Sequence, residues 1–346
     1  NSIGLKLVQV ELLVFENKLD KAEKLLNELQ HIDPRNDEVY IQRANIFSKQ
    51  GSHKKAIECL KIALQYTEDF ADVYSLLGME YLFIDEILQA NDAFIKCLEH
   101  DSEDQTALYN VVYCYDFLDN HQEAIEFLEE FIDHNPYSEV AWHQLGREYY
   151  TLKDYRKAIE AFDFACIIDE NFVGAYIEKG KSYEKIKMFS QAIICYKETL
   201  KLDDPSSYVY RRIGFCYEAL KNYDKALKYY LRSVHEDPLM DKSWIAIADL
   251  YLKKNDFKKA LQFVNKALGI DEHNHLYWRR FAIINKDLQF LEEAELGFRK
   301  AVEHGDTFLD TWLYWSDSFR LLEDYPQAIE KLLKARDIFY DDYEIE

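Results

Sequence analysis

Apolar residues recur along the chain at intervals of three, four and seven, in a pattern that repeats every 34 residues. Such intervals place side chains on one face of an α-helix. Each unit therefore predicts two amphipathic helices joined by a short polar turn, as at Lys153-Asp154 and Lys221-Asn222. The first helix should run about fourteen residues. Because only 10 Gly and 5 Pro interrupt 346 residues, the pattern predicts an all-α chain with short connections.

One alanine occupies the same place in all ten units. These alanines are Ala22, Ala56, Ala90, Ala124, Ala158, Ala192, Ala226, Ala260, Ala294 and Ala328. Since no residue is inserted or lost between them, the units begin at residues 3, 37, 71, 105, 139, 173, 207, 241, 275 and 309. We predict one continuous array over residues 3–342, followed by an acidic tail over 343–346.

A small residue stands twelve positions before the alanine in most units. Its occupants include Ala44, Gly78, Gly146, Gly180, Gly214, Ala248, Ala282 and Ser316. A Trp or Tyr usually precedes it by four positions, and another aromatic residue follows it by three. We expect the two helices of a unit to cross so closely at the small residue that a larger side chain would separate them. The aromatic residues should fill the wedge around the crossing.

The run Trp142, Leu145, Gly146, Tyr149, Ala158, Phe162 and Ala165 closely resembles the tetratricopeptide repeat. The resemblance extends over nearly the whole chain. It implies an α-solenoid, a right-handed superhelix of ten helix-turn-helix repeats whose first helices line an inner groove. Members of the family bind many unrelated partners, so the resemblance implies a protein-binding scaffold and not an enzyme.

Residues at the positions that face the groove in this family change in character along the chain. Copies three to five carry Met79, Phe83, Tyr109, Asn110, Tyr113, Phe117, His143 and Tyr150, and copies five to nine carry Arg147, Lys181, Arg211, Arg212, Arg279 and Arg280. An aromatic lining that becomes cationic favours a protein or extended peptide with apolar and acidic groups. The alternative is that the rings pack on adjacent helices and the arginines pair with groove acids such as Glu184 and Asp249.

A formal net charge of −22 disfavours nucleic acid and anionic membranes as partners. Apolar runs are too short for a membrane span. The six cysteines form no CxxC pair, which predicts core residues in a reducing compartment and hence a cytoplasmic protein.

Catalytic and metal-binding motifs are not apparent in the sequence. It has no glycine-rich nucleotide loop, and His273 and His275 lack a third metal ligand nearby. We therefore predict no catalytic residue, cofactor or metal.

The first predicted helix, residues 3–16, is apolar around most of its circumference and has Val10 in the small position. An earlier repeat or domain that packs there would explain this surface, and so would self-association through it. Two alternative functions therefore stay open. In the first, the chain is the regulatory or targeting arm of a larger multidomain protein, and that larger protein could be an enzyme. In the second, it is a self-assembling structural element.

Overall fold

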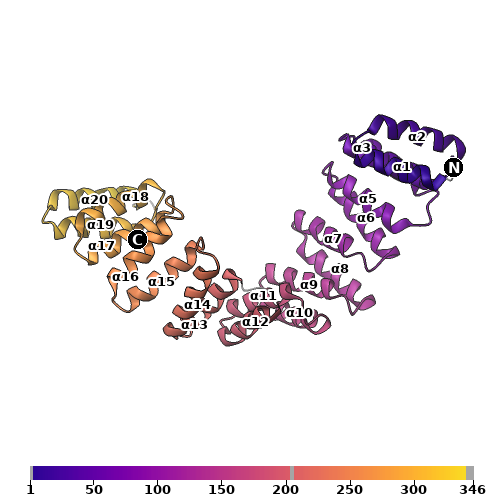
Figure 1. Cartoon of the computed structure of the whole chain (residues 1–346). Coiled ribbons are helices and arrows are strands. Elements are labelled where there is room, and N and C mark those ends of the chain that lie inside the picture. Colours follow the sequence, from indigo (N-terminus) through magenta and orange to yellow (C-terminus); the bar gives the residue numbers. More distant parts are fainter. Residues whose placement is uncertain (1–2, 203–205, 340–346) are drawn as a thin grey trace, which may run out of the picture. The chain divides into compact units, whose positions relative to one another are not determined.

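A computed structural model describes residues 3–202 and 206–339, and the predicted tail over 343–346 lies outside them. The described residues form twenty α-helices and no strand, which confirms the all-α prediction (Figure 1). The first helices of the copies are α1 (Ile3–Phe15), α3 (Asp37–Lys49), α5 (Phe70–Leu82), α7 (Gln105–Phe117), α9 (Glu139–Thr151), α11 (Val173–Lys185), α13 (Ser207–Ala219), α15 (Asp241–Lys253), α17 (His275–Asp287) and α19 (Leu309–Leu321). The second helices are α2 (Leu19–Ile32), α4 (His53–Ala63), α6 (Ile87–His100), α8 (His121–His134), α10 (Tyr155–Ile168), α12 (Phe189–Leu202), α14 (Tyr223–Glu236), α16 (Phe257–Leu268), α18 (Leu291–Glu303) and α20 (Tyr325–Phe339).

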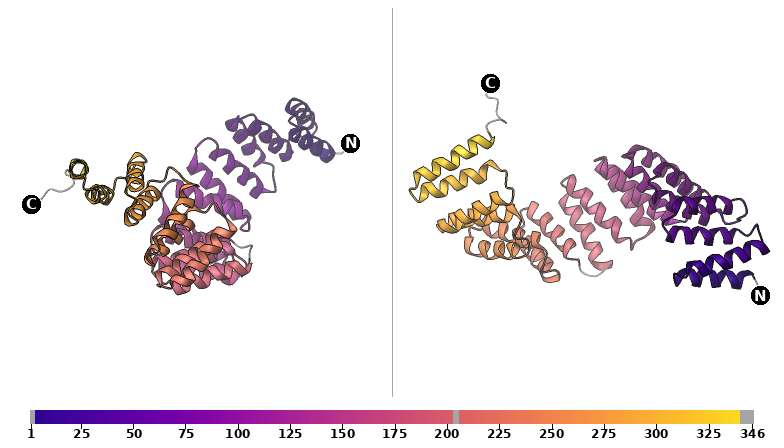
Figure 2. Two further views of the ribbon diagram at one scale, coloured as in Figure 1. Left: turned by 60° about the vertical axis from the view of Figure 1, so that its left-hand side comes forward. Right: turned by 90° about the horizontal axis from the view of Figure 1, so that it is seen from above.

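The helices belong to two compact units, Asn1–Ser182 and Tyr183–Glu346. In the first unit α5 packs on α6 and α6 on α7, and in the second α13 packs on α14 and α14 on α15. The views in Figure 2 show successive helices side by side within each unit. This is the helix-on-helix stacking of a solenoid. That the ten copies form one continuous array stays a prediction.

The crossing between the two helices of a copy is as close as the small residues predict. All ten alanines of the repeat are buried. A Cβ atom added to Gly78 would lie 2.7 Å from the ring of Phe94, and one added to Gly214 would lie 2.6 Å from the ring of Tyr230. Glycine is therefore required at these crossings because the ring of the second helix already fills the space.

The aromatic residue near the start of several first helices has a polar role in addition to packing. The indole N–H of Trp142 donates to the carbonyl of Pro136 at 3.0 Å, and that of Trp244 donates to the carbonyl of Pro238 at 2.9 Å. The hydroxyl of Tyr40 donates in the same way to the carbonyl of Pro34 at 3.0 Å. These bonds tie each helix to the connection that precedes it, because a Trp or Tyr combines an apolar ring with one donor.

The turn inside each copy contains one residue with a left-handed backbone. These residues recur every 34 positions, at Asn17, Gly51, Asp85, Asp119, Lys153, Lys187, Lys221, Asn255, Gln289 and Glu323. A left-handed residue directly after a helix ends it and reverses the chain. The second helix of the copy can then pack antiparallel to the first.

Helix α1 leaves an apolar face uncovered. Leu5, Val8, Leu12 and Phe15 are all exposed, and their spacing places them on one side of the helix. The prediction that an earlier repeat or a second copy of the chain covers this face stays a prediction. No helix within the described residues combines the length and apolar character that crossing a bilayer requires.

Candidate binding surface on the first helices

Five large apolar side chains on α5 and α7 stay exposed, with exposed fractions between 37% and 59%. We call them the aromatic strip; they are Met79, Phe83, Tyr109, Tyr113 and Phe117. The α7 members are spaced four residues apart and therefore share one helix face, as do the two α5 members. All five were predicted to line the groove.

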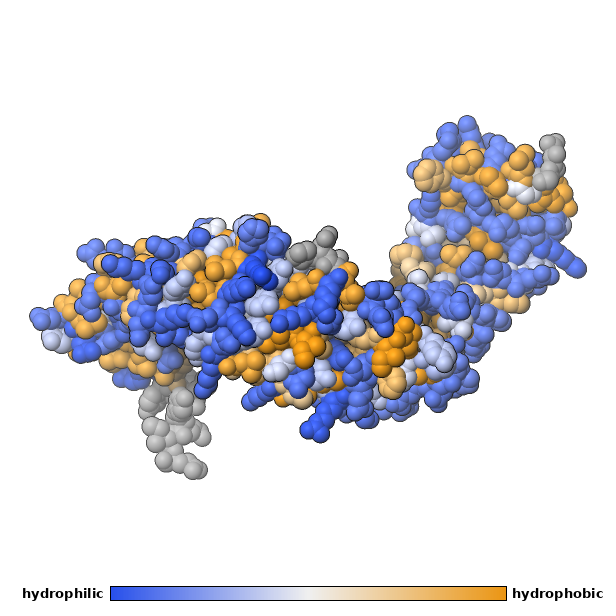
Figure 3. Space-filling view, turned by 60° about the horizontal axis from the view of Figure 1, so that its bottom comes forward, coloured by the Kyte–Doolittle hydropathy of each residue, from blue (hydrophilic) through white to orange (hydrophobic). Residues whose placement is uncertain are grey.

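One contact beside the strip joins α5 to α7. The side-chain amide of Asn110 lies 3.8 Å from the sulfur of Met79, and the rings of Tyr113 and Phe117 have centroids 6.3 Å apart. On the face drawn in Figure 3, hydrophobic residues occur in small groups among hydrophilic ones. Apolar exposure alone is therefore not distinctive. The strip stands out because it gathers large side chains on adjoining helices, which is typical of interaction sites.

The predicted lining residues of α9 differ in accessibility. The imidazole of His143 lies between the rings of Phe162 and Phe172, with centroids at 5.7 and 4.8 Å. Burial, with a further contribution from Arg147, lowers the pKa of His143 to about 4, so the ring is neutral at pH 7. Arg147 itself is exposed and donates to the side-chain oxygen of Gln144 at 3.1 Å. Tyr150 is half-buried against Tyr155, with ring centroids 5.3 Å apart.

Further along the chain, the predicted cationic residues are largely engaged by the protein's own carboxylates. Lys181 pairs with Glu178 at 2.7 Å, and Arg280 pairs with Asp249 at 2.7 Å. Such pairs reduce the positive charge that these positions offer to a partner.

The arginines of α13 and α17 show the same engagement. Arg212 holds both oxygens of Glu184, with its Nε 3.0 Å from Oε1. The guanidinium of Arg279 lies 4.4 Å from the ring centroid of Phe308, and that of Arg211 lies 5.4 Å from the ring centroid of Tyr208. These contacts stack the guanidinium planes on the protein's own rings.

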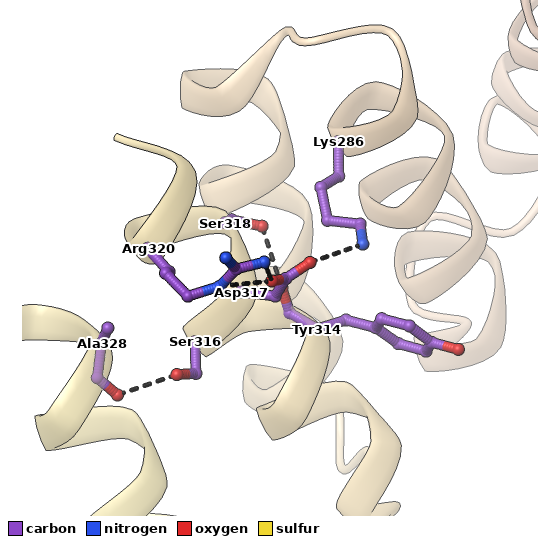
Figure 4. A network of polar contacts seen from close by, with 7 residues as sticks. All are labelled: Lys286, Tyr314, Ser316, Asp317, Ser318, Arg320 and Ala328. Carbon is purple, nitrogen blue, oxygen red and sulfur yellow. Dashed lines mark hydrogen bonds and ion pairs between the residues drawn. The ribbon is translucent and has the colours of Figure 1, made fainter. Parts of the chain in front are cut away.

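In copies nine and ten, basic side chains are likewise paired with an acid of the protein itself, in the polar network that Figure 4 shows. Asp317 accepts from Lys286 at 3.0 Å and from the guanidinium of Arg320 at 2.5 and 3.0 Å. Nearby, the hydroxyl of Ser316 donates to the carbonyl of Ala328 at 3.0 Å and so ties α19 to α20. The pair of Lys286 and Asp317 was not predicted from the sequence. Their 31-residue separation places them on corresponding faces of the first helices of two successive copies.

The cysteines lie in the core, as their positions in the repeat predict. All six are buried. Burial raises the pKa of the Cys114 thiol to about 11 and that of the Cys216 thiol to about 12, so neither is a thiolate at neutral pH. His273 lies in the turn before α17, and His275 is the first residue of that helix.

The geometry of paired helices with close glycine and alanine crossings agrees with comparisons of the sequence. Models of the tetratricopeptide repeat match residues 37–70, 105–137, 140–171, 173–205 and 206–273, which together make up more than half of the chain. The chain belongs to the tetratricopeptide repeat family. Both matching models are of this repeat.

Curated relatives share only short segments with this tetratricopeptide repeat chain. Protein bimA of Emericella nidulans is 34% identical over 92 residues, which is 27% of this chain and 11% of that protein. The cell division cycle protein 27 homolog of Caenorhabditis elegans is 39% identical over 67 residues, which is 19% of this chain and 8% of that protein. The aligned segments thus span about a tenth of the length of these relatives.

A solved structure has the same fold over most of the chain. The crystal structure of the APC/C hetero-tetramer Cut9-Hcn1 matches with a TM-score of 0.50 and 14% identity, covering 97% of this chain and 81% of that one. At this identity the similarity establishes the α-solenoid fold alone.

Proposed function

We propose that the chain is a protein-binding scaffold whose aromatic strip takes apolar side chains of an extended peptide or a partner helix. The observation that carries this proposal is the exposure of five large apolar side chains on one surface of α5 and α7. Covering such surface contributes about 25 cal/mol per Å² of apolar area removed from water. Aromatic side chains also dominate the energetics of protein interfaces.

Acidic groups of the partner would meet an accessible cation on the helix next to α7. Helix α9 packs against α7, and Arg147 of α9 is exposed. A carboxylate beside the apolar segment could accept charge-assisted hydrogen bonds from its guanidinium. Arg212 and Arg280 contribute less to this proposal because a ligand carboxylate would have to compete with Glu184 and Asp249.

The experiment that tests this function selects binders from a displayed library of random peptides on the intact chain. Selected peptides are then titrated against wild type, a Tyr113→Ala/Phe117→Ala variant and a control variant, Leu88→Ala/Ile167→Ala. The control removes exposed apolar side chains from α6 and α10. We expect the strip variant to bind about tenfold more weakly or worse, and the control to bind as wild type does. Equal affinities for all three proteins would contradict the proposed use of the strip.

Self-assembly through α1 is a second candidate because its exposed face carries Leu5, Val8, Leu12 and Phe15. Light scattering of wild type and a Leu5→Glu/Leu12→Glu variant distinguishes it from a monomeric scaffold. A molar mass that rises with concentration only for wild type favours assembly, whereas a constant monomer mass rejects it. We propose the cytoplasm as the compartment, since six buried cysteines suit a reducing environment.

A further inference from the structure

A polar cluster lies where copy four meets copy five. His121 is the first residue of α8, Asp116 lies near the end of α7, and Glu148 lies on α9. The Nδ1 atom of His121 is 2.9 Å from Oε2 of Glu148 and 3.2 Å from Oδ1 of Asp116. These three atoms all lie within 4.8 Å of one another. Two carboxylate oxygens thus converge on one imidazole nitrogen.

One imidazole nitrogen cannot satisfy both carboxylates, because it carries at most one hydrogen. In the structure Nδ1 is bonded to Glu148, and Oδ1 of Asp116 is a buried atom without a hydrogen-bond partner. The side chain of Glu148 is only 3% exposed, so a negative charge on it is poorly solvated. A buried, incompletely paired charge is costly unless a cation joins it.

We propose that Asp116 Oδ1, His121 Nδ1 and Glu148 Oε2 bind a divalent transition-metal ion of the Zn²⁺ type. Bonds of about 2.0–2.1 Å in a tetrahedral site place ligand atoms roughly 3.3 Å apart. The two separations from Nδ1, 2.9 and 3.2 Å, therefore need to open by only a few tenths of an ångström. The imidazole ligand favours a transition metal over Ca²⁺ and Mg²⁺, which prefer oxygen ligands. Three protein ligands leave a fourth position for water or a partner's side chain.

The other nitrogen of the same ring supports this assignment. Nε2 of His121 lies 3.4 Å from Oδ1 of Asp119. Metal-binding histidines commonly donate their second ring N–H to a carboxylate, which orients the ring and increases its basicity as a ligand. The left-handed backbone of Asp119, with φ at 57°, brings this carboxylate back toward the ring.

Copies two and three contain the same histidine–glutamate pair without the third ligand. Nδ1 of His53 lies 2.9 Å from Oε2 of Glu80, and both residues are in the same repeat positions as His121 and Glu148. Ser48 stands where Asp116 stands in copy four, and Gly51 stands in place of Asp119. The junction of copies two and three, which lacks one of the three proposed ligands, is therefore an internal control for the junction of copies four and five.

The test measures zinc binding to the full chain after treatment with a chelator. Bound metal is counted by elemental mass spectrometry, and affinity is measured by competition with a chromogenic zinc chelator. We expect wild type to bind one equivalent, and Asp116→Ser to lose more than the roughly 10–100-fold in affinity that changes to outer-shell partners cause. Ser48→Asp should add a second equivalent at the junction of copies two and three.

We expect Asp116→Ser to fold normally, because copy two already combines a serine with a histidine–glutamate pair. Far-UV circular dichroism and the thermal midpoint of each variant verify it. Zinc bound adventitiously at exposed histidines such as His273 would be the same in wild type and Asp116→Ser. Stoichiometry and affinity that Asp116→Ser leaves unchanged would overturn the assignment.

Discussion

Gly146 of α9 lies directly against the ring of Phe162 of α10: a Cβ atom on Gly146 would be 2.5 Å from Cε1 of that ring. The same relation joins Gly78 to Phe94 and Gly214 to Tyr230. Copy two instead has Ala44 at the small position and a leucine in place of the ring. In these copies the size of one residue compensates that of the other across the crossing, whereas copy nine combines Ala282 with Phe298 and has Gly297 beside the alanine.

Gly146→Ala should destabilise the α9–α10 pair. Overpacking costs about 1–3 kcal/mol, and we expect the upper part of that range because Phe162 is fully buried. The greater helix propensity of alanine returns about 1 kcal/mol. Hydrogen exchange of amides in α9 and α10 measures the local free energy of opening.

Phe162→Leu should offset part of the loss caused by Gly146→Ala, since it reproduces the alanine–leucine combination of copy two. The double variant should be more stable than the sum of the two single changes predicts, by about 1 kcal/mol. Additive effects would show that the ring and the glycine do not share the space.

The sequence was sufficient to predict the fold because its constraints are local. Helical spacing, the alanine and the small position each define which faces meet, and the constant 34-residue period carries that information from copy to copy. The bonds from Trp142 and Trp244 to the preceding connection were not predicted. Their geometry depends on the path of a carbonyl in a turn, which the helical pattern does not describe.

The left-handed turn residues lead to a paired prediction. Gly51 has a φ of 69°, and a Cβ atom added to it would touch nothing within 4 Å, so Gly51→Ala introduces backbone strain alone. It should cost about 1 kcal/mol. Gln289 has a φ of 67°, and Gln289→Gly should relieve strain and stabilise by about 0.5–1 kcal/mol. Shifts of the thermal midpoint in opposite directions are the expected result, and shifts of the same sign would contradict it.

The candidate site was less predictable than the fold. Repeat position predicts which side chains of the first helices stay exposed, and the exposure of Tyr109 and Phe117 agrees with that prediction. Repeat position does not determine which group the charged end of a long side chain contacts. Arg212 and Arg280 reach carboxylates 28 and 31 residues away, in the copy before their own. The competition between a partner and such an internal acid depends on rotamers that no periodicity encodes.

Arg212→Ala should destabilise the protein more than Arg280→Ala. The side chain of Glu184 is 5% exposed, so removing Arg212 leaves a buried carboxylate without its counter-ion, at a cost of about 3–5 kcal/mol. Arg280 is 42% exposed and Asp249 is 24% exposed, so water screens this pair more, and losing Arg280 should cost about 1–3 kcal/mol because Oδ1 of Asp249 is still buried. Hydrogen exchange in α13 and α17 compares the two changes.

Similar protection in both arginine variants would contradict the expected difference between the more buried and the less buried pair. The result also affects binding experiments. If Arg212→Ala opens α13, then loss of a partner on substitution of Arg212 reports unfolding, and Arg147 is the better residue for testing recognition of acidic groups.

His143 should make stability fall with acidification. Its pKa is about 4 in the folded chain because of burial and the nearby Arg147, partly offset by Glu178, whereas an unfolded histidine titrates near 6.5. Between these values the unfolded state binds more protons, so the stability contributed by the neutral ring is fully present above about pH 6.5 and is lost as the pH falls toward 4. The loss should be about 3 kcal/mol across that window.

A His143→Asn variant provides the control for this pH dependence, because it keeps a polar side chain that does not titrate. The protection of amides in α9 and α10, measured by hydrogen exchange at pH 7 and pH 4.5 and corrected for the intrinsic exchange rate, should fall more steeply for wild type than for the variant. Other acids titrate in the same range in both proteins, so the difference between the two slopes isolates the imidazole. Parallel slopes would mean that His143 is protonated in the folded chain and has access to solvent between Phe162 and Phe172.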